Sequence, residues 1–158
     1  MDTNPLAEPA RVAFAGDWHM NGPWARKSIN HARDHHADVI VHLGDFGYTF
    51  DRRFVDAVEG ACAEAGLPLL FVDGNHEHHP KLLRYPIRDN GLRQVSGHVW
   101  HLPRGFRWQW AGRTWLALGG AYSVDRPWRT PGVSWWLGET ITPQQAARTI
   151  ERGPADVL

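Results

Sequence analysis

Residues 37–47 read Ala-Asp-Val-Ile-Val-His-Leu-Gly-Asp-Phe-Gly, and this stretch decides the fold. Its mostly apolar run, residues 39–43, ends at Gly44, which is typical of a buried strand in a parallel sheet. Open α/β sheets bind their ligands just beyond the carboxyl ends of such strands. Asp45 therefore lies where chemistry is expected, on a sharp turn that Gly44 permits.

Two other stretches repeat this design. Residues 12–19 read Val-Ala-Phe-Ala-Gly-Asp-Trp-His, and residues 69–77 read Leu-Leu-Phe-Val-Asp-Gly-Asn-His-Glu. The carboxyl ends of parallel strands meet at one edge of a sheet, so the polar residues after these runs should converge. The converging set is Asp17, His19, Asp45, Asn75 and His76. Their oxygen and nitrogen donors suit Mn, Fe or Zn.

The ordered motifs Asp17-x-His19, Gly44-Asp45 and Gly74-Asn75-His76-Glu77 resemble the calcineurin-like metallophosphoesterase family. The resemblance covers residues 11–158 and implies an α/β fold, a β-sandwich flanked by helices (α/β/β/α). It also implies two divalent metal ions, Mn²⁺, Fe²⁺/Fe³⁺ or Zn²⁺. By this resemblance Asp17 and His19 bind one ion, Asp45 bridges both, Asn75 binds the second, and His76 is the catalytic residue that acts on the substrate.

In this family a later histidine and a Gly-His-x-His segment supply further metal ligands. Nothing after Leu158 corresponds to them. We therefore expect residues 11–158 to be the N-terminal portion of the domain, with the C-terminal part missing. The active site of the 158-residue chain would then be incomplete and its activity low.

The resemblance implies hydrolysis of phosphate mono- or diesters by a hydroxide that two metal ions activate. The alternative is a non-catalytic domain of the same fold that binds a nucleotide, nucleic acid or a protein partner. Residues 1–80 hold twelve acidic and six basic residues, whereas residues 81–129 hold two acidic and nine basic ones. This segregation suits an anionic substrate, although a solubilising surface could show it by accident.

Three further residues are weaker candidates for substrate binding. Arg52 follows Asp51, and the family often has such an Asp-Arg pair a few residues after its Gly-Asp, but the gap here is longer. A surface arginine at a helix start is the other interpretation. His78 either lines the pocket, as His79 would, or is an exposed loop residue. Arg126 either contacts the substrate phosphate or holds its own loop.

Composition sets the remaining expectations. A chain of 158 residues with 42% hydrophobic residues is long enough for one domain with a substantial core. Its single cysteine, Cys62, fits a reducing compartment and a packing role. No stretch is long enough to span a membrane, and the first residues carry no secretory signal, so we expect a cytoplasmic protein. Residues 1–10 are expected to form a flexible tail.

Hydrophobic periodicity predicts helices over residues 23–36, 51–65 and 144–153, with a short one over 80–85. It predicts strands over 11–17, 38–45 and 69–72. Antiparallel strands of a second sheet are expected over 99–102, 106–110 and 113–118, with a turn at Ala111-Gly112, and a last strand over 155–158. Trp108 and Trp110 alternate with the polar residues Arg107 and Gln109, which fits one buried face better than a surface for stacking nucleic-acid bases.

Overall fold

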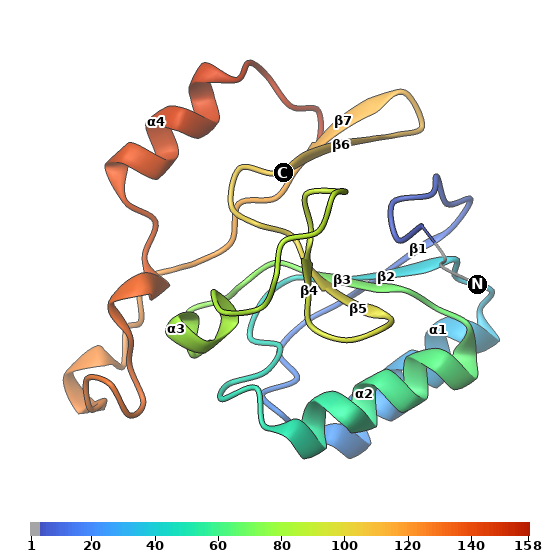
Figure 1. The fold of residues 1–158 in the computed structure, drawn as a ribbon, viewed down its shortest axis with the longest axis horizontal. Helices are drawn as coiled ribbons and strands as arrows, with labels where there is room; N and C mark the ends of the chain where they lie inside the picture. The colour runs from blue at the N-terminus through green and yellow to red at the C-terminus, as the bar shows by residue number, and fades with distance from the viewer. Residues whose placement is uncertain (1–3) are drawn as a thin grey trace.

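The computed structural model describes residues 4–158, which form a five-stranded sheet with two helices on one face and a hairpin on the other (Figure 1). The strands are β1 (Val12–Ala15), β2 (Val39–His42), β3 (Leu69–Phe71), β4 (Arg93–Gln94), β5 (Val99–His101), β6 (Arg107–Trp110) and β7 (Arg113–Leu116). The helices are α1 (Gly22–Asp34), α2 (Arg52–Ala65), α3 (His79–Leu82) and α4 (Pro143–Glu151), with 3₁₀ turns η1 (Arg126–Trp128) and η2 (Leu137–Glu139). The predicted α/β class is confirmed.

The large sheet has the strand order β1-β2-β3-β5-β4. Its first four members run parallel, and β4 is antiparallel to β5. The carboxyl ends of β1, β2 and β3 therefore meet at one edge, as the three sequence motifs require.

The prediction for residues 99–102 was wrong. We expected an antiparallel strand of the second sheet, but β5 is a parallel neighbour of β3 in the first. Val99 is fully buried in the core on the helix side, and Leu102 is fully buried in the core on the other side. A segment that is apolar on both faces suits the middle of a parallel sheet better than a half-exposed hairpin.

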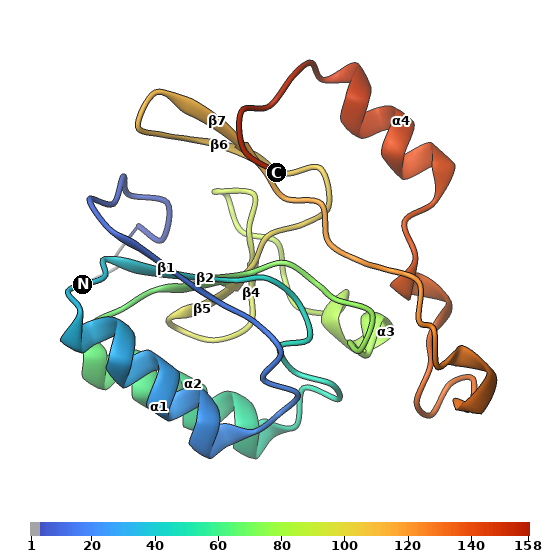
Figure 2. The ribbon, with the colours of Figure 1, turned by 180° about the vertical axis from the view of Figure 1, so that it is seen from behind.

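Helices α1 and α2 lie side by side beneath the sheet, on the side away from the hairpin (Figure 2). The Asn21 side chain accepts from the Trp24 N–H at the start of α1, and Asp51 accepts from the Arg53 N–H at the start of α2. Both helices bury an apolar stripe against the sheet: Ala25, Ile29 and Ala32 from α1, and Phe54, Val55, Val58, Ala61 and Cys62 from α2. The predicted packing role of Cys62 is confirmed.

The second sheet is the hairpin β6–β7. Ala111 and Gly112 form its two-residue turn with φ values of 52° and 66°, which is the left-handed geometry that such turns use. Trp110 is buried in the second core cluster, and Trp108 and Trp115 pack against that cluster. One face of the hairpin is thus buried, as the alternation predicted.

The C-terminal segment packs beside this hairpin. A capping box at Thr142 and Gln145 starts α4, and the Arg107 guanidinium donates to the Thr149 carbonyl within that helix (3.1 Å). The strand predicted over residues 155–158 is reduced to a single bridge between Val157 and Trp115.

The predicted tail differs from what residues 4–10 form. Pro5 is buried, Leu6 packs against the second core cluster, and the Leu6 carbonyl accepts from the Trp110 indole N–H (3.1 Å). The first three residues of the predicted tail lie outside the described residues. Among residues 4–158, no helix has both the length and the apolar character needed to cross a bilayer.

Candidate metal centre

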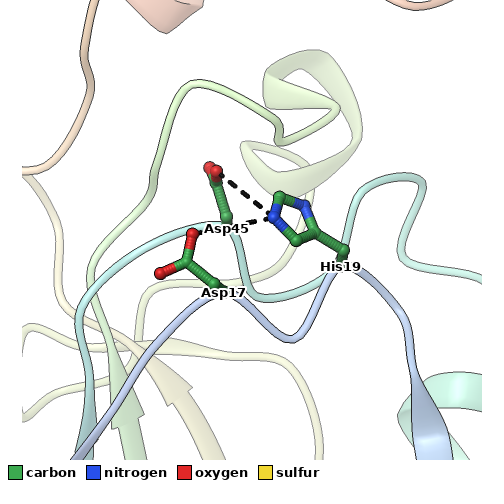
Figure 3. A group of neighbouring side chains, drawn as sticks. All are labelled: Asp17, His19 and Asp45. Atoms are coloured by element: carbon green, nitrogen blue, oxygen red, sulfur yellow. Dashed lines mark ion pairs between the residues drawn. The ribbon is translucent and has the colours of Figure 1, made fainter.

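Three candidate ligands meet beyond the carboxyl ends of β1 and β2 (Figure 3). Asp17 Oδ1 lies 3.6 Å from His19 Nε2, and Asp45 Oδ2 lies 3.8 Å from the same nitrogen. One ligand atom from each side chain lies within 4.8 Å of the other two. We call Asp17, His19 and Asp45 the ligand triad.

The backbone at the triad is held in an uncommon conformation. Asp17, His19 and Asp45 have φ values of 57°, 45° and 56°, in the left-handed region that residues other than glycine rarely adopt. Two hydrogen bonds hold the loops there, from the Asp17 N–H to the Gly44 carbonyl (3.1 Å) and from the His19 N–H to the Asp45 carbonyl (2.9 Å). Such strain costs about 1–3 kcal/mol per residue and collects at functional sites.

Two glycines let the loops after β2 and β3 touch. A Cβ atom on Gly74 would overlap the Asp45 carboxylate, and one on Gly44 would lie 3.1 Å from the Gly74 Cα. This close approach allows the His76 N–H to donate to Asp45 Oδ1 (3.0 Å). The Asp45 carboxylate is thereby held in one orientation: Oδ1 accepts from the His76 backbone N–H, and Oδ2 faces His19.

The Glu77 side chain also connects the loops after β2 and β3. It is fully buried, with Oε1 accepting from the Phe46 N–H and Oε2 from the Gly74 N–H, both at 2.6 Å. Burial and the negative charges of Asp45 and Asp73 raise the pKa of Glu77 to about 8. The motif residue Glu77 is thus a structural clamp beneath the triad.

Asn75 shares a cavity with the two carboxylates of the triad. The cavity has a volume of about 280 Å³ and is lined by Asp17, Asp45, Asn75 and residues 118–121, among others. The Asn75 amide nitrogen donates to Ser123 Oγ (2.9 Å). Its only other polar side-chain atom is a carbonyl oxygen, the donor type that hard divalent ions prefer.

The chemistry of this donor set fits a divalent cation. Two carboxylates and one imidazole present oxygen and nitrogen atoms within 4.8 Å of one another. The two negatively charged carboxylates repel each other, and a bound cation would offset that repulsion. Asp17 is largely exposed and the Asp45 side chain is mostly buried, so the cluster opens to solvent on one side.

His76 lies next to the triad without being one of its members. Its ring packs edge-on against the His19 ring, with centroids 5.3 Å apart, and its Nε2 lies 3.9 Å from Asp125 Oδ2. About a quarter of the His76 side chain is exposed. The ring therefore lies at the border between the triad and solvent.

Residues 10–151 match the sequence model of a family described as calcineurin-like phosphoesterase. The chain belongs to this family. A comparison with curated proteins found no match. Membership makes metal-dependent hydrolysis of phosphoesters the general chemistry of this fold, and the Asp17–His19–Asp45 group is a candidate for holding the metal.

Two of the arginines expected at the phosphoesterase substrate have other partners. Arg52 is 93% exposed, and its Nε lies 3.4 Å from Asp56 one turn further along α2. The Arg126 guanidinium lies 4.1 Å above the centre of the Trp135 ring. Substrate contact by either side chain stays a prediction, and the observed contact of Arg126 favours the loop-holding alternative.

His78 and His79 take structural positions in the phosphoesterase fold. His78 Nδ1 accepts from the Lys81 N–H (3.2 Å) as the N-cap of α3, and its ring stacks on Trp136 with centroids 4.4 Å apart. Burial lowers the pKa of His78, so the ring is neutral near pH 7. His79 is only 4% exposed, which excludes the exposed-loop interpretation for that residue.

Sequence reasoning missed a buried cluster behind the phosphoesterase site. Asp73 Oδ1 lies 3.1 Å from His101 Nε2, and Asp73 Oδ2 accepts from His79 (3.2 Å) and from Arg104 Nη2 (2.6 Å). Burial alone would raise the pKa of Asp73, but hydrogen bonds from His101 and His79 outweigh it and hold the pKa well below its usual range. Because Asp73 follows an apolar run, the sequence indicates that its carboxylate is buried and needs hydrogen-bond partners. Which residues are those partners is seen only in the folded structure.

Proposed function

We propose that this phosphoesterase hydrolyses phosphate mono- or diesters by means of two divalent ions, Mn²⁺, Fe²⁺/Fe³⁺ or Zn²⁺. The observation that carries this proposal is the ligand triad, which gathers three metal-type donor atoms within 4.8 Å at the carboxyl edge of the sheet. Membership of the calcineurin-like family supports the choice of phosphoesters as the substrate class.

In this proposal Asp17 and His19 hold one ion, Asn75 holds the other, and Asp45 contributes to both. A carboxylate can serve two ions because it has two oxygens, and the Asp45 side chain is already fixed by the His76 N–H. When bound, such ions polarise the phosphoryl oxygens and supply a nucleophilic water at neutral pH. Asn75 contributes a neutral oxygen, so most of the negative charge toward the ions comes from Asp17 and Asp45.

His76 is the proposed catalytic residue. A histidine ring can donate a proton to a phosphoryl oxygen or to the departing alkoxide. The backbone of His76 is held by Asp45, whereas its ring is next to His19 at the solvent border. The ring is thus positioned by its backbone and is free to meet a substrate.

The test combines metal binding with turnover. The protein is stripped with EDTA and dialysed, titrated with Mn²⁺ by calorimetry, and assayed on p-nitrophenyl phosphate, bis-p-nitrophenyl phosphate, nucleotides and short DNA. We expect Mn²⁺ binding, and a low rate of hydrolysis that EDTA abolishes and Mn²⁺ restores. Turnover that survives EDTA, or an absence of Mn²⁺ binding, would overturn the proposal. Mn²⁺ binding without turnover of any ester would favour a ligand-binding domain of this fold.

A further inference from the structure

We propose that Ser123, Arg129 and Glu139 form a relay that fixes the orientation of the Asn75 amide, with its oxygen facing the cavity shared with Asp17 and Asp45. The three are positioning residues, since they act through Asn75. The inference rests on the proposed function insofar as it takes the Asn75 oxygen as a metal ligand. We call Ser123, Arg129 and Glu139 the Ser123 relay.

The relay is a continuous set of hydrogen bonds centred on one hydroxyl group. Ser123 Oγ donates to Glu139 Oε2 (2.8 Å) and accepts from Arg129 Nη1 (2.5 Å) and from Asn75 Nδ2 (2.9 Å). Ser123 and Glu139 are at most 1% exposed, and the Arg129 side chain is 6% exposed. The network is therefore shielded from water that could replace any of its members.

The chemistry of the partners fixes the direction of each bond. A carboxylate only accepts hydrogen bonds, and a guanidinium only donates them. The single hydroxyl proton of Ser123 must therefore go to Glu139, which leaves only lone pairs on Ser123 Oγ for its remaining partners. Asn75 must meet those lone pairs with its NH₂ group, so its carbonyl oxygen is turned away from Ser123.

The reverse orientation of Asn75 would break the relay. An amide oxygen facing Ser123 Oγ would need the hydroxyl proton, and Glu139 would then lose a donor inside the protein. A buried carboxylate that loses a hydrogen bond is strongly destabilised. The Ser123 N–H, 3.3 Å from Glu139 Oε1, and the Arg129 Nη1, 3.4 Å from Glu139 Oε2, further hold this carboxylate in place.

The loop that carries Ser123 is anchored to the strand end that carries Asn75. The Gly120 N–H donates to the Asp73 carbonyl (2.6 Å), and a Cβ atom on Gly119 would overlap the Asp73 backbone. This contact brings residues 119–123 against residues 73–75. The relay thus reaches Asn75 from a segment nearly fifty positions away in the sequence.

The orientation of Asn75 matters because its two polar ends have opposite effects on a cation. The carbonyl oxygen binds a cation, and the NH₂ group repels it. An unrestrained amide would visit both orientations, and only one of them binds. Residues that orient metal ligands typically contribute 10–100-fold to metal affinity.

The experiment compares Ser123→Ala and Glu139→Gln with Ser134→Ala. Ser134 lies in the same segment, and its hydroxyl accepts from the Thr130 N–H and bonds to no relay residue. Its backbone carbonyl accepts from Arg129 Nε, and alanine keeps that carbonyl, so Ser134→Ala is a matched control. The first readout is the side-chain NH₂ resonance pair of Asn75 in metal-free protein, identified by its loss in Asn75→Ala. We expect Ser123→Ala and Glu139→Gln to shift this pair, while Ser134→Ala leaves it unchanged.

The second readout is Mn²⁺ affinity measured by calorimetry. We expect Ser123→Ala to lower it roughly 10-fold or more, Ser134→Ala to leave it unchanged, and Ser123→Ala to have no further effect when Asn75 is already alanine. Additive effects of Ser123→Ala and Asn75→Ala would overturn the relay, as would equal effects of Ser123→Ala and Ser134→Ala. If Ser123→Ala fails to fold, Glu139→Gln is judged by the same criteria.

These experiments distinguish a failure of the Ser123 relay from a failure of the proposed function. Unchanged Mn²⁺ affinity in Asn75→Ala would refute Asn75 as a ligand, while the resonance shifts in metal-free protein would still decide whether the relay holds its amide. Unshifted resonances in Ser123→Ala together with a large loss of affinity in Asn75→Ala would refute the relay and leave the proposed function intact.

Discussion

At the scale of single residues, both carboxylate oxygens of Asp45 have partners within the candidate site. One of its oxygens accepts from the His76 N–H and the other faces His19. Asp45→Asn keeps an oxygen for the backbone bond but loses the negative charge. We expect Mn²⁺ affinity to fall at least tenfold and hydrolysis to be lost, with little change in thermal stability. Calorimetry checks this, with Asp34→Asn on the surface of α1 as the control, and wild-type affinity in Asp45→Asn would refute the assignment.

A variant of His76 can test substrate chemistry separately from metal binding. Its backbone N–H supports Asp45, and alanine preserves that N–H. We therefore expect His76→Ala to lower kcat by roughly 10²–10⁴, the range for a lost acid–base group, and to keep wild-type metal content. Elemental analysis beside the kinetic assay measures both quantities. A loss of metal as large as that of Asp45→Asn would make His76 a ligand instead.

The sequence predicted which candidate site residues lie together when those residues followed a buried strand within a few positions. Asp17, His19 and Asp45 converge because parallel strands end at one edge, and that follows from local pattern alone. Ser123 and Asp73 could not be assigned in this way. Their roles depend on hydrogen bonds across 48 and 28 positions, to Asn75 and to His101, and no periodic pattern encodes such contacts.

At the scale of elements, hydrophobic periodicity predicted the helices well, and the strand β5 was assigned to the wrong sheet. Thr142, Asp51 and Gly66 mark helix ends through local bonds, which a sequence displays directly. The sheet to which a three-residue strand belongs depends on which neighbour pairs with it. Val99 pairs with Leu69 across thirty positions, so proximity to the hairpin in sequence was misleading.

The hairpin turn offers a test at this scale. Ala111 occupies a left-handed position (φ 52°) that costs alanine about 1–2 kcal/mol, whereas asparagine tolerates it and Asn-Gly is a favoured pair in such turns. We expect Ala111→Asn to raise the free energy of unfolding by about 0.5–1 kcal/mol in urea titrations. Gly112→Ala should have the opposite effect, since φ there is 66° and no other atom lies within 4 Å of the added Cβ. Destabilisation by both variants would contradict this account of the turn.

At the scale of the whole molecule, the sheet separates two apolar cores, and the one on the helix side contains a histidine. His42 at the end of β2 is fully buried, and its ring packs against Trp18 and Phe46 with centroid distances of 4.6 and 5.4 Å. Within residues 4–158, neither ring nitrogen has a hydrogen-bond partner. Burial, and secondarily the charge of His19, lowers the pKa of His42 to about 3.

This histidine makes the stability of the fold sensitive to acid. Its pKa is about 3 in the folded state and about 6.5 when unfolded, so between these values the unfolded chain binds one more proton. The part of the stability that depends on His42 is therefore complete above pH 6.5 and falls as pH decreases, by about 1.4 kcal/mol per pH unit. His42→Leu removes the proton-binding group, so we expect wild type to lose about 2 kcal/mol more than His42→Leu between pH 6.5 and 5 in urea unfolding. His31→Leu, on the exposed face of α1, should keep the wild-type pH dependence. Equal pH dependence in wild type and His42→Leu would mean that the His42 ring is accessible to protons in the folded protein.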